Sequence, residues 1–94
     1  MKVRYTRRAF QDREHIFDYL AERSPAGAQN VTAQVLAAVA RLADHPLSGI
    51  ATDVADVRVV FVGRYPYKVF YRVRGETIDI LHIRHTSRRP AGLE

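Results

Sequence analysis

Apolar and polar side chains alternate in three short runs within the stretch Val57–Arg89. β-Branched and aromatic residues dominate each run, which is typical of β-strands. Turn-forming residues separate the runs, first at Gly63–Pro66 and again at Arg74–Glu76. The pattern therefore predicts an antiparallel meander of three strands, each of ordinary strand length.

The segment before the meander predicts a short strand followed by a helix. Lys2–Tyr5 alternates polar and apolar side chains, as a half-buried strand does. Thr6 is a suitable N-cap for a first helix over Arg7–Arg23. The apolar residues of this helix that we expect to face a core are Phe10, Ile16, Phe17 and Leu20. The acidic residues that we expect mostly on its solvent-exposed side are Asp12, Glu14, Asp18 and Glu22.

A second helix is predicted from Pro25 to about Ala43. Ser24 is a favoured N-cap, and proline is favoured at the first helical position. The pair His45-Pro46 ends the helix, because the residue before a proline is biased away from helical geometry. Apolar residues three and four apart predict a buried stripe, which consists of Ala28, Val31, Val35, Ala38, Val39 and Leu42. Residues 47–56 are predicted to be a loop that leads into the meander.

These elements predict a single α+β domain that spans residues 1–94. The connection between the two helices is short, so we expect an antiparallel helical hairpin. The expected architecture is an N-terminal strand and this hairpin packed on a mostly antiparallel four-stranded sheet, in the order β-α-α-β-β-β.

The meander carries apolar side chains on both of its predicted faces. In the middle strand, one face has Tyr67, Val69, Tyr71 and Val73, and the other has Lys68, Phe70, Arg72 and Arg74. In the last strand, Ile78 and Ile80 point one way, whereas Leu81 and Ile83 point the other way. Helices cover only one face of a two-layer domain. The apolar side chains on the second face therefore have three alternative explanations. They are ordinary exposed apolar residues, a β-bulge near Ile80-Leu81, or a second chain that covers the open face.

The composition and charge narrow the classes of partner. The chain has no cysteine, which excludes disulfides, thiolate nucleophiles and cysteine-based zinc sites. No segment resembles a signal peptide or a membrane span, so we expect a cytoplasmic protein without a membrane partner.

The formal net charge of +5 favours an anionic partner, namely RNA, DNA or an acidic protein. The basic residues concentrate from Val57 onward, in the predicted sheet and tail.

Few residues suggest chemistry on their own. The chain has no glycine-rich phosphate loop and no metal-ligand spacing, so we expect neither a cofactor nor a metal. His82 and His85 lie three residues apart in a predicted strand, which places them on opposite faces if the strand is regular. A hydrogen-bonding role is therefore expected for each histidine.

One combination of residues would suit RNA cleavage. Cationic side chains would hold phosphates and His85 would transfer a proton. The cations in question are Lys68, Arg72, Arg88 and Arg89. The alternative is that these cations are solvated or pair with an acidic protein. Tyr65, Tyr67 and Tyr71 could likewise stack on bases, or be half-buried residues of the core.

Two motifs in this region resemble the RelE/ParE superfamily of toxins from bacterial type II toxin–antitoxin modules. Gly63–Val73, with the sequence GRYPYKVFYRV, resembles the family's R-x-P-Y-x-I-x-Y-x-V strand. Ile80–Arg89, with the sequence ILHIRHTSRR, resembles its closing I-x-H-x-x-R strand. The resemblance covers nearly the whole chain and implies the fold predicted above. It also implies a cognate antitoxin, ParD-like or other, that forms a hetero-oligomer with the toxin.

The resemblance implies one of two activities. ParE-like members poison DNA gyrase, whereas RelE-like members cleave mRNA in the ribosomal A site and often use a C-terminal tyrosine. No tyrosine follows Arg88 in this chain, and both motifs are more similar to ParE. The resemblance therefore favours a ParE-like gyrase inhibitor, of the kind linked to growth inhibition and plasmid stabilisation, with no catalytic residues of its own. The alternative is a ribosome-dependent endoribonuclease, whose catalytic residues would be Lys68, His85 and Arg88.

The basic and aromatic residues of the two motifs are also the expected contacts with the target or the antitoxin. They are Arg64, Tyr67, Lys68, Arg72, Arg74, Arg84, Arg88 and Arg89. A regulator that mainly reads DNA is not favoured, because the eight basic residues from Val57 onward lie in the predicted sheet and tail and not on a groove-reading helix.

Overall fold

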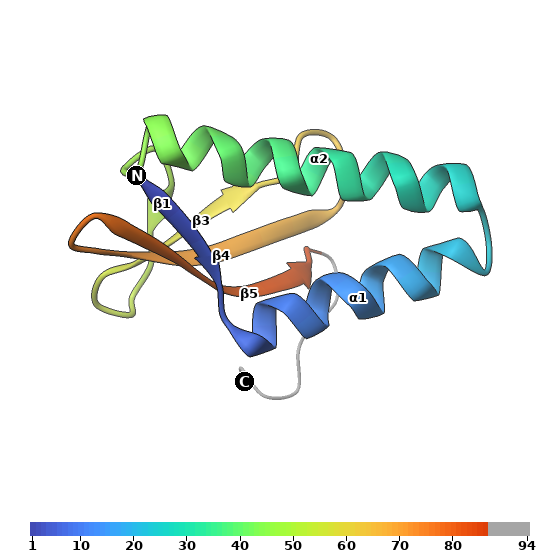
Figure 1. Ribbon diagram of the computed structural model, residues 1–94, viewed down its shortest axis with the longest axis horizontal. Helices are drawn as coiled ribbons and strands as arrows, with labels where there is room; N and C mark the ends of the chain where they lie inside the picture. Colours follow the sequence, from blue (N-terminus) through green and yellow to red (C-terminus); the bar gives the residue numbers. More distant parts are fainter. Residues whose placement is uncertain (87–94) are drawn as a thin grey trace.

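Two helices cover one face of a five-stranded sheet (Figure 1). The structure, a computed structural model, describes residues 1–86. The sheet has the strand order β1-β5-β4-β3-β2, in which β1 pairs with β5 in parallel and the other neighbours are antiparallel. The elements in chain order are β1 (Lys2–Tyr5), α1 (Arg7–Ala21), α2 (Pro25–Asp44), β2 (Ile50–Ala51), β3 (Val57–Phe61), β4 (Tyr67–Arg74) and β5 (Thr77–His85). The predicted α+β class and element order are confirmed, except that the sheet has five strands instead of four.

Both predicted helix starts are confirmed. The Thr6 hydroxyl accepts a hydrogen bond from the backbone N–H of Ala9 at 3.2 Å and donates one to the carbonyl of Ile80 at 2.8 Å. Thr6 therefore begins α1 and also joins this point of the chain to β5. The Ser24 hydroxyl accepts from the N–H of Gly27 at 3.0 Å, with Pro25 at the first position of α2.

The core lies between α2 and the sheet. The predicted stripe of α2 is confirmed in full, since all six of its residues are buried. It packs against the inward-facing residues of the sheet, of which Val69, Tyr71, Ile78 and Ile80 are completely buried.

The predicted core side of α1 was partly wrong. Phe10 and Phe17 are 46% and 39% exposed, and the buried residue of α1 is Ala9. Ile16 and Leu20 pack against the core as predicted. Successive helical residues are about 100° apart around the axis, so a core-facing line through positions 9, 16 and 20 turns positions 10 and 17 outward.

The additional strand, β2, lies in the segment that was predicted to be a loop. Ile50 pairs with Val59 and Ala51 pairs with Arg58 at the edge of the sheet. A two-residue strand is too short to leave an alternating pattern in the sequence, which is why it was missed.

A β-bulge explains the unexpected apolar pattern of β5. Phe70 pairs with His82, but its neighbour Tyr71 pairs with Ile80, so that Leu81 is the extra residue. An extra residue shifts the alternation of side chains by one position. Ile83 therefore joins Ile80 on the side that faces the helices, where both are buried. The bulge, which was one of the three alternatives that the sequence left open, is confirmed.

Candidate functional site

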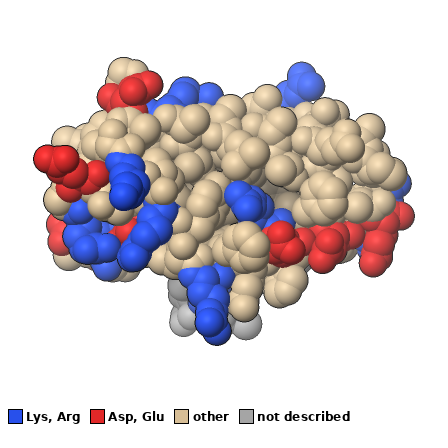
Figure 2. All heavy atoms as spheres, viewed as in Figure 1, with Lys and Arg blue, Asp and Glu red and all other residues tan. Residues whose placement is uncertain are grey.

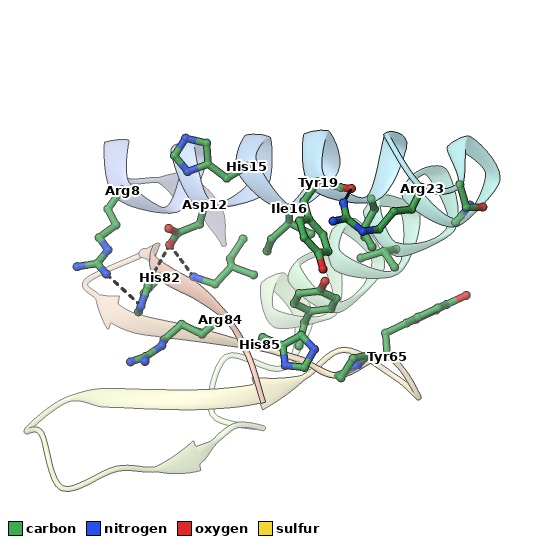
Figure 3. Close-up of a pocket in the computed structure, with 17 residues that line it drawn as sticks. Arg8, Asp12, His15, Ile16, Tyr19, Arg23, Tyr65, His82, Arg84 and His85 are labelled. Carbon is green, nitrogen blue, oxygen red and sulfur yellow. Dashed lines mark hydrogen bonds and ion pairs between the residues drawn. The ribbon is translucent and has the colours of Figure 1, made fainter. Parts of the chain in front are cut away.

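A groove with a volume of about 800 Å³ opens between the helical hairpin and one end of the sheet. Figure 3 shows side chains of α1, of the segment before β4 and of the end of β5 around it. Its apolar lining comes from Ile16, Leu20, Val31 and Ile83. Its basic lining comes from Arg8, Arg23 and Arg84, and its aromatic lining comes from Tyr19, Tyr65 and Tyr67. The groove is thus an apolar channel with a positively charged border.

One wall of the groove holds a chain of polar contacts. Nδ1 of His82 lies 2.5 Å from the carboxylate of Asp12, and Nε2 lies 3.3 Å from the guanidinium of Arg8. Because a guanidinium can only donate, Nε2 accepts and Nδ1 carries the proton in the neutral imidazole. Burial of the ring lowers the pKa of His82 below its ordinary value, although the hydrogen bond with Asp12 acts in the opposite direction. The neutral form is therefore favoured at neutral pH.

Asp12 also completes the hydrogen bonding of the sheet edge. Its carboxylate accepts a hydrogen bond from the N–H of Ile83 at 3.0 Å. The pairing of β1 with β5 reaches only as far as Ile80, so α1 covers the part of β5 that follows. The prediction that Asp12 would lie on the solvent-exposed side of α1 was therefore wrong. Its partner is 70 residues away in the sequence, and no local pattern indicates such a contact.

Two of the nuclease candidates face opposite sides of the sheet. Lys68 pairs with Arg84 in the β4–β5 register, and Tyr67 pairs with His85. Adjacent residues of a strand point to opposite faces. His85 lies on the helix side, where its ring meets Tyr67 edge-on at 5.2 Å and lines the groove. The third candidate, Arg88, lies outside the described residues.

The predicted binding residues do not form one continuous surface. Tyr67 and Arg84 are buried and line the groove. Arg64 is exposed in the turn before β4, with its guanidinium 5.8 Å from the ring centroid of Tyr65. Lys68, Arg72 and Arg74 alternate with the core residues of β4 and so lie on the face away from the helices. Arg88 and Arg89 lie outside the described residues.

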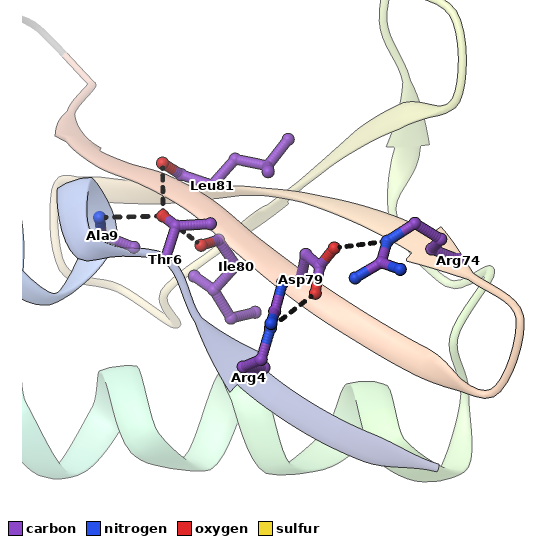
Figure 4. A network of polar contacts seen from close by, with 7 residues as sticks. All are labelled: Arg4, Thr6, Ala9, Arg74, Asp79, Ile80 and Leu81. Atoms are coloured by element: carbon purple, nitrogen blue, oxygen red, sulfur yellow. Dashed lines mark hydrogen bonds and ion pairs between the residues drawn. The ribbon is translucent and has the colours of Figure 1, made fainter.

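Arg74 has a structural role on that open face. It donates to the carboxylate of Asp79 at 3.0 Å, and Arg4 donates to the other oxygen at 3.3 Å (Figure 4). Asp79 is only 5% exposed, and its pKa is lowered chiefly by the hydrogen bond from Arg74. The two contacts join β1 and β4 to the β5 strand that lies between them.

Charged side chains are unevenly distributed over the surface. Figure 2 shows acidic side chains along α1, whereas Lys and Arg side chains gather around the turn between β4 and β5, with acidic side chains beside them. Glu14 and Asp18 lie on the exposed side of α1, and the exposed Glu22 is its C-cap, as predicted for these three acidic residues. Among residues 1–86, no group of three or more histidine or acidic side chains is arranged to hold a metal ion. None of the helices in this part of the chain is both long and apolar enough to cross a membrane.

The fold and the two motif strands define the class of toxins found in type II toxin–antitoxin modules. Residues 3–90 match the family described as the ParE toxin of the type II toxin–antitoxin system parDE. This match covers nearly the whole chain, and the protein belongs to the ParE toxin family. Family membership implies a cognate antitoxin as a partner.

Individual relatives are likewise described as toxins or as part of a toxin–antitoxin system. "Toxin RelE2" of Caulobacter vibrioides is 32% identical over 87 residues, which are 93% of this chain and 97% of the relative. "Putative toxin Y4kP" of Sinorhizobium fredii is 30% identical over 84 residues, which are 89% of this chain and 86% of the relative. A solved structure described as a chromosomal ParDE TA system from P. aeruginosa has a TM-score of 0.82 at 27% identity, over 93% of this chain and 97% of that one.

Proposed function

We propose that this toxin inhibits DNA gyrase in the cytoplasm, that it does so without catalytic residues of its own, and that a ParD-like antitoxin neutralises it in a hetero-oligomer. The observation that carries the proposal is the separation of Lys68 from His85 on opposite faces of the sheet. A nuclease of the RelE type needs a proton acceptor, a proton donor and cations around one phosphodiester. An inhibitor that acts by binding needs only a surface.

The test compares two activities of the purified toxin. Gyrase supercoiling in the presence of the toxin measures the proposed activity, and an in vitro translation reaction with mapped mRNA ends measures the alternative. We expect supercoiling to be inhibited, with accumulation of broken DNA, and the mRNA to stay intact. Codon-specific mRNA cuts with undisturbed supercoiling would reject the proposal.

The groove supports the antitoxin part of the proposal. An amphipathic segment that carries apolar and acidic side chains would match its apolar channel and its basic border. Asp12 is the only carboxylate that lines the groove among residues 1–86, and it is already bonded to His82 and Ile83. An acidic segment would therefore meet little repulsion there.

One observation favours the endoribonuclease as a second candidate. A carboxylate that holds a histidine in a fixed tautomer is how many enzymes orient a general base, and Asp12 holds His82 in this manner. In that case the reaction would use His82 in place of His85, once the substrate had displaced the Arg8 guanidinium from Nε2. Mapping of mRNA ends with the parent protein and a His82→Gln variant tests this candidate. If the candidate is correct, the parent protein cuts the mRNA and the variant does not.

A further inference from the structure

The open face of the sheet carries an apolar and aromatic row between two rows with basic side chains. Residues that pair directly across strands lie side by side on one face. The row of Ile50, Val59, Phe70 and His82 follows from the pairs Ile50–Val59, Val59–Phe70 and Phe70–His82. On one side of this row the pair Phe61–Lys68 adds an exposed aromatic ring and a cation. On the other side, Arg72 follows on β4.

The aromatic groups of this face are arranged as a platform. The rings of Phe70 and His82 are nearly parallel, with an interplanar angle of 21° and centroids 6.0 Å apart. The ammonium group of Lys68 lies 5.4 Å from the centroid of the Phe70 ring. The ammonium group lies over the ring, so a flat group that stacks on Phe70 would displace it from the ring and keep its positive charge alongside.

The described strand positions of the same face carry no exposed carboxylate. Asp79 is the one carboxylate among the described strand positions that point away from the helices, and it is buried between Arg4 and Arg74. Lys68 and Arg72 form no ion pair with any residue among 1–86. They lie four residues apart on one strand, a separation of about 13 Å, with Phe70 between them. Cations that flank an aromatic ring are typical of surfaces that bind single-stranded nucleic acid.

We propose that this open face binds a single strand of DNA, with bases stacked on Phe70 and phosphates held by Lys68 and Arg72. An acidic peptide would use the cations but gain nothing specific from a stacking platform. DNA is favoured over RNA because recognition of a 2′-hydroxyl needs a polar partner. The central row offers only apolar groups and the imidazole of His82, whose two nitrogens are engaged by Asp12 and Arg8. The inference deepens the proposed action on gyrase, on which its role in the cell rests.

The binding is tested with the whole purified toxin and a fluorescent DNA oligonucleotide of about 12 nucleotides, within the site sizes of single-strand-binding domains. We expect binding that weakens with salt and is tighter for DNA than for RNA of the same sequence. Phe70→Leu keeps the apolar contact with Val59 but removes the ring, and should weaken binding about tenfold. Arg72→Gln should weaken binding and reduce the slope of log affinity against log salt by about 0.7.

Two matched variants serve as controls. Arg41→Gln removes a cation from the exposed side of α2, and Phe17→Leu removes an exposed ring from α1. Both should leave the DNA affinity unchanged. Each of four results would overturn the inference. They are no binding at low salt, an equal loss of DNA affinity in the control variants, tighter binding of RNA than of DNA, and displacement of the DNA by poly-glutamate together with no effect of Phe70→Leu.

The gyrase assay separates this inference from the proposed function. Supercoiling that is still inhibited by a toxin unable to bind DNA would remove the open-face inference alone. DNA binding by a toxin that leaves supercoiling unaffected would remove the gyrase proposal and keep the binding face.

Discussion

The carboxylate of Asp12 on α1 lies 2.5 Å from Nδ1 of His82 on β5, across 70 residues of sequence. The contact attaches the helical hairpin to the edge of the sheet where β1 no longer covers β5. It also sets the tautomer of His82, because Arg8 donates to the other ring nitrogen. One hydrogen bond thus connects the packing of α1 to the wall of the groove.

The first prediction concerns pH. His82 has a lowered pKa in the folded protein, so between this value and the unfolded value of about 6.5 the folded state binds fewer protons. The part of the stability that depends on a neutral His82 is fully present above pH 6.5. It is lost as the pH falls from 6.5 toward the pKa of His82 in the folded protein. Urea unfolding at a series of pH values should show this loss.

A histidine comparison isolates the group responsible. His82→Gln should flatten the pH dependence in that window, whereas replacing the exposed His15 by Gln should leave it unchanged. A parent protein that becomes more stable as the pH falls from 7 to 6, through an effect that His82→Gln removes, would contradict the assignment.

The second prediction concerns Tyr71, which is fully buried at the centre of the sheet. Its hydroxyl accepts from the N–H of Gly49 at 2.9 Å and donates to the carbonyl of Pro46 at 2.8 Å. Tyr71→Phe leaves both backbone groups without this partner, so we expect a loss of about 1–3 kcal/mol in the free energy of unfolding. Chemical denaturation measures it, and an unchanged midpoint would show that the two bonds do not contribute.

Gly49 provides a companion variant at the same contact. A Cβ atom at this position would lie 2.6 Å from the Tyr71 hydroxyl oxygen, which is well inside van der Waals contact. Gly49→Ala should therefore destabilise the fold by about 1–3 kcal/mol through overpacking. Gly75→Ala is the comparison variant without overpacking. A Cβ atom at position 75 would meet no atom within 4 Å, so the only strain would come from the positive φ of 61° at this residue.

The sequence predicted those features that repeat within one element. The stripe of α2 and the alternation of β4 are each set by a period of side chains along a single helix or strand, so Val35 and Val69 were placed correctly. The sequence also indicated the bulge as one alternative, because Ile80 and Ile83 can share a face only if one extra residue intervenes. All three inferences needed no knowledge of distant partners.

The features that were missed depend on how elements pack together. Phe10 and Phe17 are as apolar as Ile16, and only the rotation of α1 against β5 decides which of them is buried. The roles of Asp12 and Gly49 follow from contacts with residues far along the chain. The opposite orientations of Lys68 and His85 come from the bulge. In a regular hairpin facing residues such as Arg74 and Thr77 are an odd number of positions apart, so Lys68 and His85 would have shared a face.

The third prediction tests the core. Val35 is 2% exposed on α2 and packs within the main hydrophobic cluster. Val35→Asp would bury a charge without a partner, which is a severely destabilising change. Circular dichroism and thermal unfolding should show an unfolded or strongly destabilised protein. The exposed Leu36 is the matched control, and Leu36→Asp should retain the fold.

The fourth prediction concerns the antitoxin. If the groove binds an acidic segment, association should slow as salt increases, because charges at the border mainly speed encounter. Arg23 lies at this border. Its guanidinium carbon is 3.7 Å from the centroid of the Tyr19 ring, and its guanidinium donates a hydrogen bond to the Tyr19 carbonyl at 2.8 Å. Arg23→Gln should slow association several-fold and weaken the salt dependence, as measured by surface plasmon resonance. Arg41→Gln is the control, and equal effects of both variants would place the antitoxin elsewhere.

The last prediction separates the two possible activities. Loss of a positioned acid or base typically reduces a rate by about 10²–10⁴. Lys68 and His85 point to opposite faces of the sheet and so do not flank one phosphodiester. We therefore expect Lys68→Ala and His85→Ala to reduce toxicity only modestly, as measured by growth arrest on induction without antitoxin. His85→Ala also removes the edge-on contact with Tyr67, an effect of about 0.5–1.5 kcal/mol, so thermal unfolding of both variants must accompany the growth assay. Codon-specific mRNA cleavage that vanishes in folded His85→Ala would instead establish the endoribonuclease, and would require the strand end to rearrange when the toxin meets its target.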